Sequence, residues 1–127
     1  MDGGSRGNPG PAAVAAVVTD PSGERLGERA ETIGEATNNV AEYRALLLGI
    51  ELAKNLDADE VELVADSMLV VEQVRGNWKV KQEHLRPLRE QVLRALEGFG
   101  CWSIRHVKRG ENERADQLLN YALDEAA

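Results

Sequence analysis

A chain of 127 residues that is 43% apolar, with two Trp, two Tyr and one Phe, is long enough for one domain with an aliphatic core. It has no apolar run of about 18 residues and no secretory leader, which argues against a membrane span and secretion and favours a cytoplasmic location. The net charge of −7 argues against a nucleic-acid partner. Residues 75–94, however, hold six Lys and Arg against two Glu, which is either a basic stripe or a solvated helix face with ordinary ion pairs.

The first half of the chain predicts a hairpin followed by a helix. Residues 12–19, AAVAAVVT, form an apolar and β-branched run typical of a buried strand, which the turn DPSG closes. Residues 25–34 are more polar and predict the second strand of the hairpin. Apolar residues then recur at helical spacing from the segment TNNVAEYRAL to about Leu56.

The second half alternates strands and helices. The expected elements are a strand at 59–66, a short helix at 67–75, a loop GNWKVKQ, a helix at 83–97, a strand at 101–107 and a final amphipathic helix capped by Asn112. Cys101 lies in an alternating apolar run, so we expect a buried structural thiol. This order of elements predicts an α/β fold in which helices pack on the faces of a mixed sheet.

Four acidic residues stand at the ends of the expected elements: Asp2, Glu42, Asp66 and Asp116. Each has a purely structural alternative. Glu42 follows Asn39 by three positions, as the acid of a capping box would, and Asp66 lies where a strand ends and a helix begins. The charge of Asp116 would interact favourably with the dipole at the start of the last helix, and Asp2 could be a solvated residue at the N-terminus.

The surroundings of Glu42 favour a chemical role, because Ala45, Leu46 and Gly49 fall on the same helix face. A carboxylate on an apolar face needs a partner, and several carboxylates that converge without Lys or Arg repel one another. Mg²⁺ relieves that repulsion, since it is a hard cation that prefers oxygen ligands.

Four segments, in this order and separation, resemble the motif blocks of the type 1 ribonuclease H family: DGGSRGNPGP, TNNVAEYRAL, DSMLVVEQVRGNWKV and RGENERADQLLN. They cover nearly the whole chain. The resemblance implies the ribonuclease H fold, a five-stranded mixed sheet flanked by helices, with residues 1–127 as one catalytic domain. It also implies that the catalytic metal ligands are Asp2, Glu42, Asp66 and Asp116.

The resemblance further implies an enzyme that cuts the RNA strand of RNA–DNA hybrids by two-metal hydrolysis and leaves 5′-phosphate and 3′-hydroxyl ends. Its cofactor would be Mg²⁺, with Mn²⁺ as a substitute, and it would act as a monomer. The hybrid's minor groove would lie against Gly3, Gly4, Ser5, Asn8, Asn38 and Asn39, where glycines allow close approach and amides read 2′-hydroxyls. The residues expected to hold the substrate are Trp78, Lys79, Lys81 and Arg86, with a role for Arg6 and a phosphate contact for Arg109.

Three features depart from the family pattern. No basic protrusion follows the third motif, and the loop VKRGENERAD contains Arg109 but no histidine, so the resemblance is closest to the branch that lacks both features. His84 and His106 are expected to be structural. Only Met1 precedes Asp2, so either the numbering begins inside a longer natural chain or the first strand is cut short.

Two other functions remain open. One is a non-catalytic module of the same fold that binds hybrids or double-stranded RNA, and the other is a DNA-cutting enzyme of a related fold, such as a transposase, integrase or junction resolvase. Converging acids beside phosphates would not help a pure binder, and the paired asparagines with the GNPG loop favour RNA.

Overall fold

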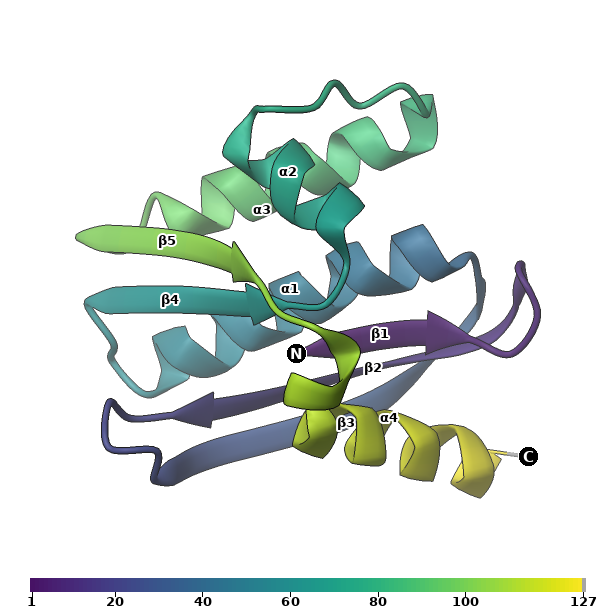
Figure 1. Ribbon diagram of the computed structural model, residues 1–127, viewed down its shortest axis with the longest axis horizontal. Coiled ribbons are helices and arrows are strands. Elements are labelled where there is room, and N and C mark those ends of the chain that lie inside the picture. The colour runs from purple at the N-terminus through teal and green to yellow at the C-terminus, as the bar shows by residue number, and fades with distance from the viewer. Residues whose placement is uncertain (127) are drawn as a thin grey trace.

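The computed structural model describes residues 1–126, apart from the side chains of Arg109 and Ala126. Within this range the chain forms five strands, four α-helices and two short 3₁₀ helices (Figure 1). In chain order they are β1 (Asp2–Ser5), β2 (Gly10–Thr19), β3 (Arg25–Ala36), α1 (Asn38–Asn55), β4 (Glu60–Ala65), α2 (Met68–Arg75), η1 (Glu83–Leu85), α3 (Arg86–Leu96), β5 (Cys101–His106), η2 (Arg109–Glu111) and α4 (Glu113–Ala126). This is the predicted order, and no further helix lies between α2 and η1 in the described chain.

The strands form two hydrogen-bonded groups. β1, β2 and β3 are antiparallel in that order, whereas β4 and β5 pair in parallel. The expected five strands are present, but the ladder is interrupted beside β1, which is only four residues long. β4 lies next to the start of β1 (Figure 1), where the Met1 amino group donates a hydrogen bond of 3.3 Å to the Val64 carbonyl oxygen.

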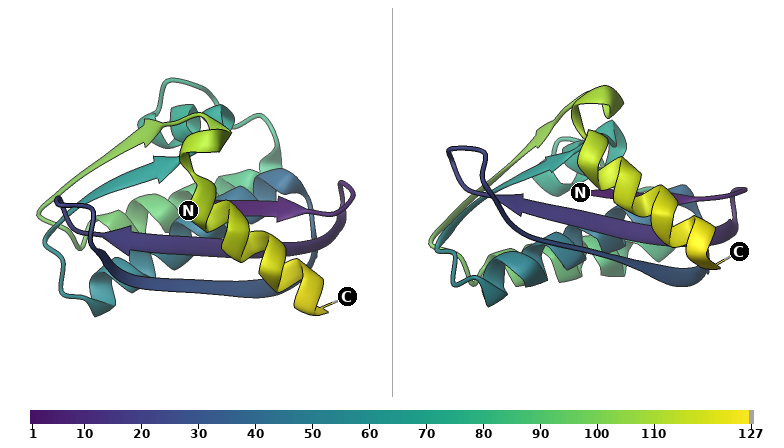
Figure 2. Two further views of the ribbon diagram at one scale, coloured as in Figure 1. Left: turned by 60° about the horizontal axis from the view of Figure 1, so that its bottom comes forward. Right: turned by 90° about the horizontal axis from the view of Figure 1, so that it is seen from below.

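The central strand β2 is covered on both faces, which explains its run of small residues. Val14 and Ala16 pack against α1, and Ala13 and Ala15 pack against Leu119 and Leu123 of α4. Figure 2 shows α4 crossing one face of β2 and β3, with α1 and α3 on the other face. Alanine side chains let both helices approach closely, so the acidic residues at the ends of these elements come near one another.

A second core fills the space between α1, α3 and the β4–β5 pair. The buried Tyr43 of α1 lies among apolar residues of these elements and donates a hydrogen bond of 2.6 Å to Gln73 Oε1 of α2. None of the helices in the described chain combines the length and apolar character that a membrane span requires.

The structure excludes the capping-box alternative for Glu42 and contradicts the expectation for Cys101. The cap of α1 is Thr37, whose hydroxyl accepts from the Val40 amide, so Glu42 lies five residues past the cap and is not the acid of a capping box. Cys101 is exposed, because the even-numbered residues of β5, such as Ile104, point inward and the odd-numbered ones point outward.

Candidate metal centre and nucleic-acid interface

Folding brings three of the four acidic residues into one cluster. Asp2 begins β1, Glu42 lies in the second turn of α1, and Asp66 directly follows β4. One carboxylate oxygen from each of these residues lies within 4.8 Å of the other two. Asp116, near the start of α4, lies outside this cluster of three but within hydrogen-bonding reach of the Asp2 side chain.

The close approach of β1 to α1 depends on Gly3. A Cβ atom at this position would lie 2.1 Å from the carbonyl oxygen of Ala41, a backbone atom that cannot move aside. Since only glycine fits there, β1 can lie directly on the α1 backbone, which sets the side chains of Asp2 and Glu42 against each other.

Burial and mutual repulsion raise the pKa values of two carboxyl groups in the cluster, Asp2 and Glu42. Burial, followed by the charge of Asp66, raises the pKa of Asp2 to about 7. Burial, followed by the charges of Asp2 and Asp66, raises the pKa of Glu42 to about 9. In addition, Asp2 Oδ2 is buried and has no hydrogen-bond partner. An unpartnered buried carboxylate oxygen is costly, so the site calls for a positive charge.

These observations fit a divalent cation. Oxygen ligands from three or four carboxylates match the preference of hard cations such as Mg²⁺ and Mn²⁺, and a bound cation would satisfy Asp2 Oδ2. It would also lower the pKa values that burial raises. The donor set therefore fits a divalent metal ion.

The amino group of Met1 lies beside the cluster, a contact that sequence reasoning missed. It donates hydrogen bonds to the carbonyl oxygen of Val64 and to Asn112 Oδ1, and the Asn112 amide donates to the Met1 carbonyl oxygen. Burial lowers the pKa of this amino group. Asn112, predicted as the cap of α4, thus joins the start of α4 to β1.

A hollow of about 460 Å³ opens over the acidic cluster. Its walls include six of the predicted substrate-binding residues: Gly3, Gly4, Ser5, Arg6, Asn38 and Asn39. Asn8 is not among the lining residues. Asn8 Oδ1 accepts a hydrogen bond of 3.0 Å from the backbone N–H of Asn38, and Asn38 Oδ1 accepts one of 2.9 Å from the backbone N–H of Ser5. Both side chains therefore hold the glycine-rich loop against the start of α1.

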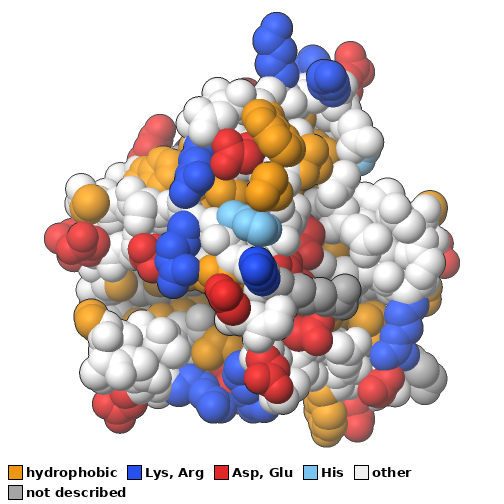
Figure 3. Space-filling model, in the orientation of Figure 1, with side chains coloured by type: hydrophobic (Ala, Val, Ile, Leu, Met, Phe, Trp, Pro, Cys, Tyr) orange, Lys and Arg blue, Asp and Glu red, His pale blue; other side chains and the backbone are white. Residues whose placement is uncertain are grey.

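A second hollow, of about 520 Å³, adjoins the first through Asn39. Its walls include Trp78, Lys79 and Lys81, the predicted gripping residues of the loop between α2 and α3. Trp78 is 46% exposed. Lys and Arg side chains project from the top of the molecule, over this connection (Figure 3).

The basic segment 75–94 forms neither a continuous basic stripe nor only a solvated helix face with ion pairs. Three of its arginines donate hydrogen bonds to backbone carbonyl oxygens and so hold the fold together: Arg75 to Ile104, Arg86 to Val80, and Arg89 to Gln73. The two lysines instead line the second hollow.

Arg6, which was also predicted to hold the substrate, lines the first hollow and not the second. Arg6 forms an ion pair of 2.5 Å with Asp124 of α4, a partner that the sequence did not indicate. The side chain of Arg109 lies outside the described residues.

The layered mixed fold and the converging carboxylates define a ribonuclease H-like domain, and comparison with known proteins agrees. A family model described as "Reverse transcriptase-like" matches residues 1–122. The ribonuclease HI of Halobacterium salinarum is 50% identical over 126 residues, which are 99% of this chain and 63% of that protein. The chain belongs to the type 1 ribonuclease H family.

Two solved structures show the same fold. The crystal structure of ribonuclease H1 from Halobacterium salinarum matches with a TM-score of 0.95 and 49% identity, over 98% of this chain and 94% of that chain. A ribonuclease H1 named LC11, crystallised in complex with an RNA/DNA hybrid, matches with a TM-score of 0.92 and 40% identity over the same shares. The five-stranded ribonuclease H architecture predicted from the motifs is therefore confirmed.

Proposed function

We propose that this chain is an endoribonuclease that hydrolyses the RNA strand of RNA–DNA hybrids and leaves 5′-phosphate and 3′-hydroxyl ends. The observation that carries the proposal is the convergence of Asp2, Glu42 and Asp66 in the lining of an open hollow, with Asp116 close to Asp2. Membership of the ribonuclease H family and similarity to an enzyme crystallised with an RNA/DNA hybrid support the choice of substrate.

The proposed cofactor is Mg²⁺, with Mn²⁺ as a substitute, held by Asp2, Glu42, Asp66 and Asp116. When bound there, two such ions would supply an activated water and would stabilise the oxygen that leaves the scissile phosphate. In this proposal the four carboxylates would hold the cations, and those of Asp2, Glu42 and Asp66 line the hollow. Asp2 is buried, so charge interactions at its carboxylate would be stronger than in water.

The rest of the hollow suits the minor groove of a hybrid. The main chain of Gly3 and Gly4 can approach a sugar closely, and the half-buried Asn39 stands between the two hollows. Amide groups at such positions can bond 2′-hydroxyls, which distinguish RNA from DNA. In this proposal Lys79 and Lys81 contact backbone phosphates in the second hollow, and Trp78 packs against the nucleic acid.

The decisive experiment follows cleavage of an end-labelled RNA–DNA hybrid with Mg²⁺, Mn²⁺ or EDTA, beside single-stranded RNA, duplex RNA and duplex DNA. We expect cleavage of the hybrid alone and none in EDTA. The Asp66→Asn variant should lose cleavage yet keep its fold and its binding to the hybrid, because Asp66 is half-buried at the end of β4.

An exposed aspartate provides the matched control. Asp57→Asn, in the turn after α1, makes the same chemical change far from the hollow and should cleave like the wild type. Robust cleavage by Asp66→Asn, or cleavage of duplex DNA in preference to the hybrid, would overturn the proposal. The expected cytoplasmic location, monomeric state and single-domain organisation stay predictions from the sequence.

A further inference from the structure

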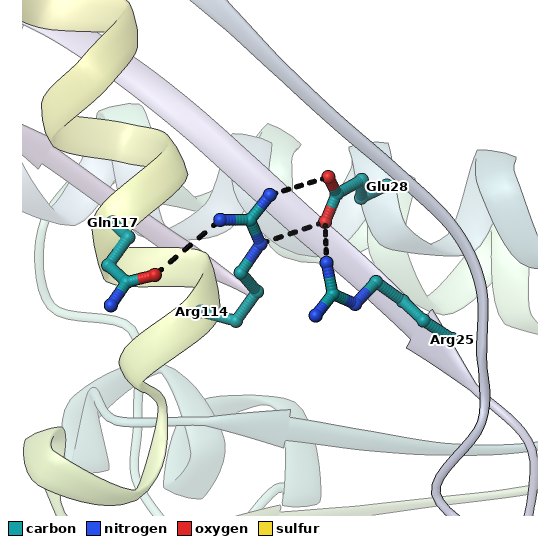
Figure 4. Close-up of polar contacts among 4 residues, drawn as sticks. All are labelled: Arg25, Glu28, Arg114 and Gln117. Atoms are coloured by element: carbon teal, nitrogen blue, oxygen red, sulfur yellow. Dashed lines mark hydrogen bonds and ion pairs between the residues drawn. The ribbon is translucent and has the colours of Figure 1, made fainter.

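A bidentate ion pair fastens the start of α4 to β3. Arg114 donates two hydrogen bonds to the Glu28 carboxylate, from Nε at 3.1 Å and from Nη2 at 2.8 Å, and Arg25 approaches the same carboxylate at 3.3 Å (Figure 4). Arg114 does not line either hollow. Its Nη1 also donates a hydrogen bond of 3.5 Å to Gln117 Oε1. We therefore expect the Arg114–Glu28 ion pair to act on the position of α4 and not by contact with the substrate.

Helix geometry gives Arg114 and Asp116 opposite directions. Successive residues of an α-helix are about 100° apart, so these two flank Ala115 on either side. Ala115 is 2% exposed and belongs to the face of α4 whose Leu119 and Leu123 pack on β2. With β2 lying between β1 and β3, Arg114 reaches β3 while Asp116 reaches Asp2 on β1.

Small side chains meet where α4 crosses β2 near Asp116, and they resist a roll of the helix about its axis less than large interlocking side chains would. Near Asp116 the helix presents Ala115, and the strand presents Ala13 and Ala15. A roll of about 10° would move a carboxylate about 6 Å from the helix axis by about 1 Å. Displacements of this size at a reacting centre are known to reduce rates by up to about 100-fold.

We propose that Arg114 is a positioning residue, whose fork on Glu28 sets the roll of α4 and thereby the distance of Asp116 from the Asp2–Glu42–Asp66 cluster. The inference rests on the proposed function in one respect, namely that Asp116 is a metal ligand. Both partners of the pair are substantially exposed, with side-chain exposures of 42% and 29%. Exposed pairs add little to stability, so the pair should matter more for the site than for the fold.

The test compares Arg114→Gln, Glu28→Gln and the double variant with the wild type. Three quantities are measured: the dissociation constant for Mn²⁺ by calorimetry without substrate, kcat and KM for a labelled hybrid, and the melting temperature. Arg25→Gln is the matched control, because it removes the other cation from Glu28 and leaves the fork to α4 intact.

We expect each single variant to bind Mn²⁺ several-fold more weakly and to lose about tenfold in kcat, with KM within about twofold and melting within about 3 °C of wild type. The double variant should lose no more Mn²⁺ affinity or kcat than either single variant, because both substitutions break the same Arg114–Glu28 contact. The control should match the wild type in all three measurements.

Three results would overturn the inference: unchanged Mn²⁺ affinity and kcat in Arg114→Gln, losses that multiply in the double variant, or an equal loss in Arg25→Gln. The Mn²⁺ titration also separates this inference from the proposed function. A wild type that binds Mn²⁺ but does not cleave hybrids refutes the proposed function, while the Mn²⁺ affinities of the variants still decide whether Arg114 positions Asp116.

Discussion

Replacement of Asp2 by Asn should stabilise the metal-free protein at pH 8, although it removes a proposed metal ligand. Asp2 is 3% exposed, and burial together with the charge of Asp66 raises its pKa from 3.8 to about 7. Asn has nearly the same shape and carries no charge. Its amide group would also donate to the carboxylates that now repel Asp2.

The sign and size of the expected change in the free energy of unfolding follow from proton binding to Asp2. With a raised folded-state pKa, the unfolded chain binds fewer protons than the folded one between pH 3.8 and about 7, so the free energy of unfolding falls as pH rises through this range. At about 1.4 kcal/mol per pH unit, the loss for Asp2 reaches about 4 kcal/mol above pH 7. We expect Asp2→Asn to recover about 2–4 kcal/mol at pH 8, or about 7–15 °C in melting temperature for a chain of this length.

The assay is thermal unfolding in EDTA at pH 5 and pH 8, with Asp57→Asn as the exposed control. The difference between Asp2→Asn and the wild type should grow from pH 5 to pH 8, and Mn²⁺ should then stabilise the wild type more than the variant. A variant that melts at or below the wild-type temperature at pH 8 in EDTA would refute the claim that the cluster is electrostatically strained.

Three further outcomes are expected. Gly3→Ala should lose about 3 kcal/mol or more in urea unfolding, because its Cβ would strike the α1 backbone, whereas Gly4→Ala, whose nearest atom is a leucine methyl at 3.4 Å, should be far milder. Tyr43→Phe should cost about 1–3 kcal/mol in the same assay, because it leaves a buried glutamine oxygen without its donor; a loss below about 0.5 kcal/mol would contradict this reasoning. Replacing Lys79 and Lys81 with Ala should weaken hybrid binding and reduce the slope of log affinity against log salt by up to about 2, and an unchanged slope would remove both from the interface.

The elements themselves were predictable because their periodicities are strong. The apolar, β-branched run of residues 12–19 and the helical spacing up to Leu56 match β2 and α1 to within two residues at both ends. The exposure of Cys101 was not predictable, because the alternating pattern indicates that one face of β5 is buried but does not indicate which face. That choice depends on how the strand pairs with β4 and on the helices that cover it.

The meeting of Asp2, Glu42 and Asp66 was predictable from the motifs, but the contacts that support these residues were not. Glu28 and Arg114 are 86 positions apart, and the Met1–Asn112 contact spans nearly the whole chain. Many exposed acids and bases along the sequence offer equally good partners. Only the crossing of α4 over β2 decides which of them meet, so these contacts emerge from the tertiary structure.

The central claim is that the carboxylates form a cation site, and diffraction from crystals grown with Mn²⁺ tests it most directly. An anomalous difference map should show manganese between the side chains of Asp2, Glu42 and Asp66, with Asp116 alongside. The Asp66→Asn crystals should show weaker manganese peaks or none there. A map with manganese only elsewhere on the molecule, at concentrations that support cleavage, would contradict the account.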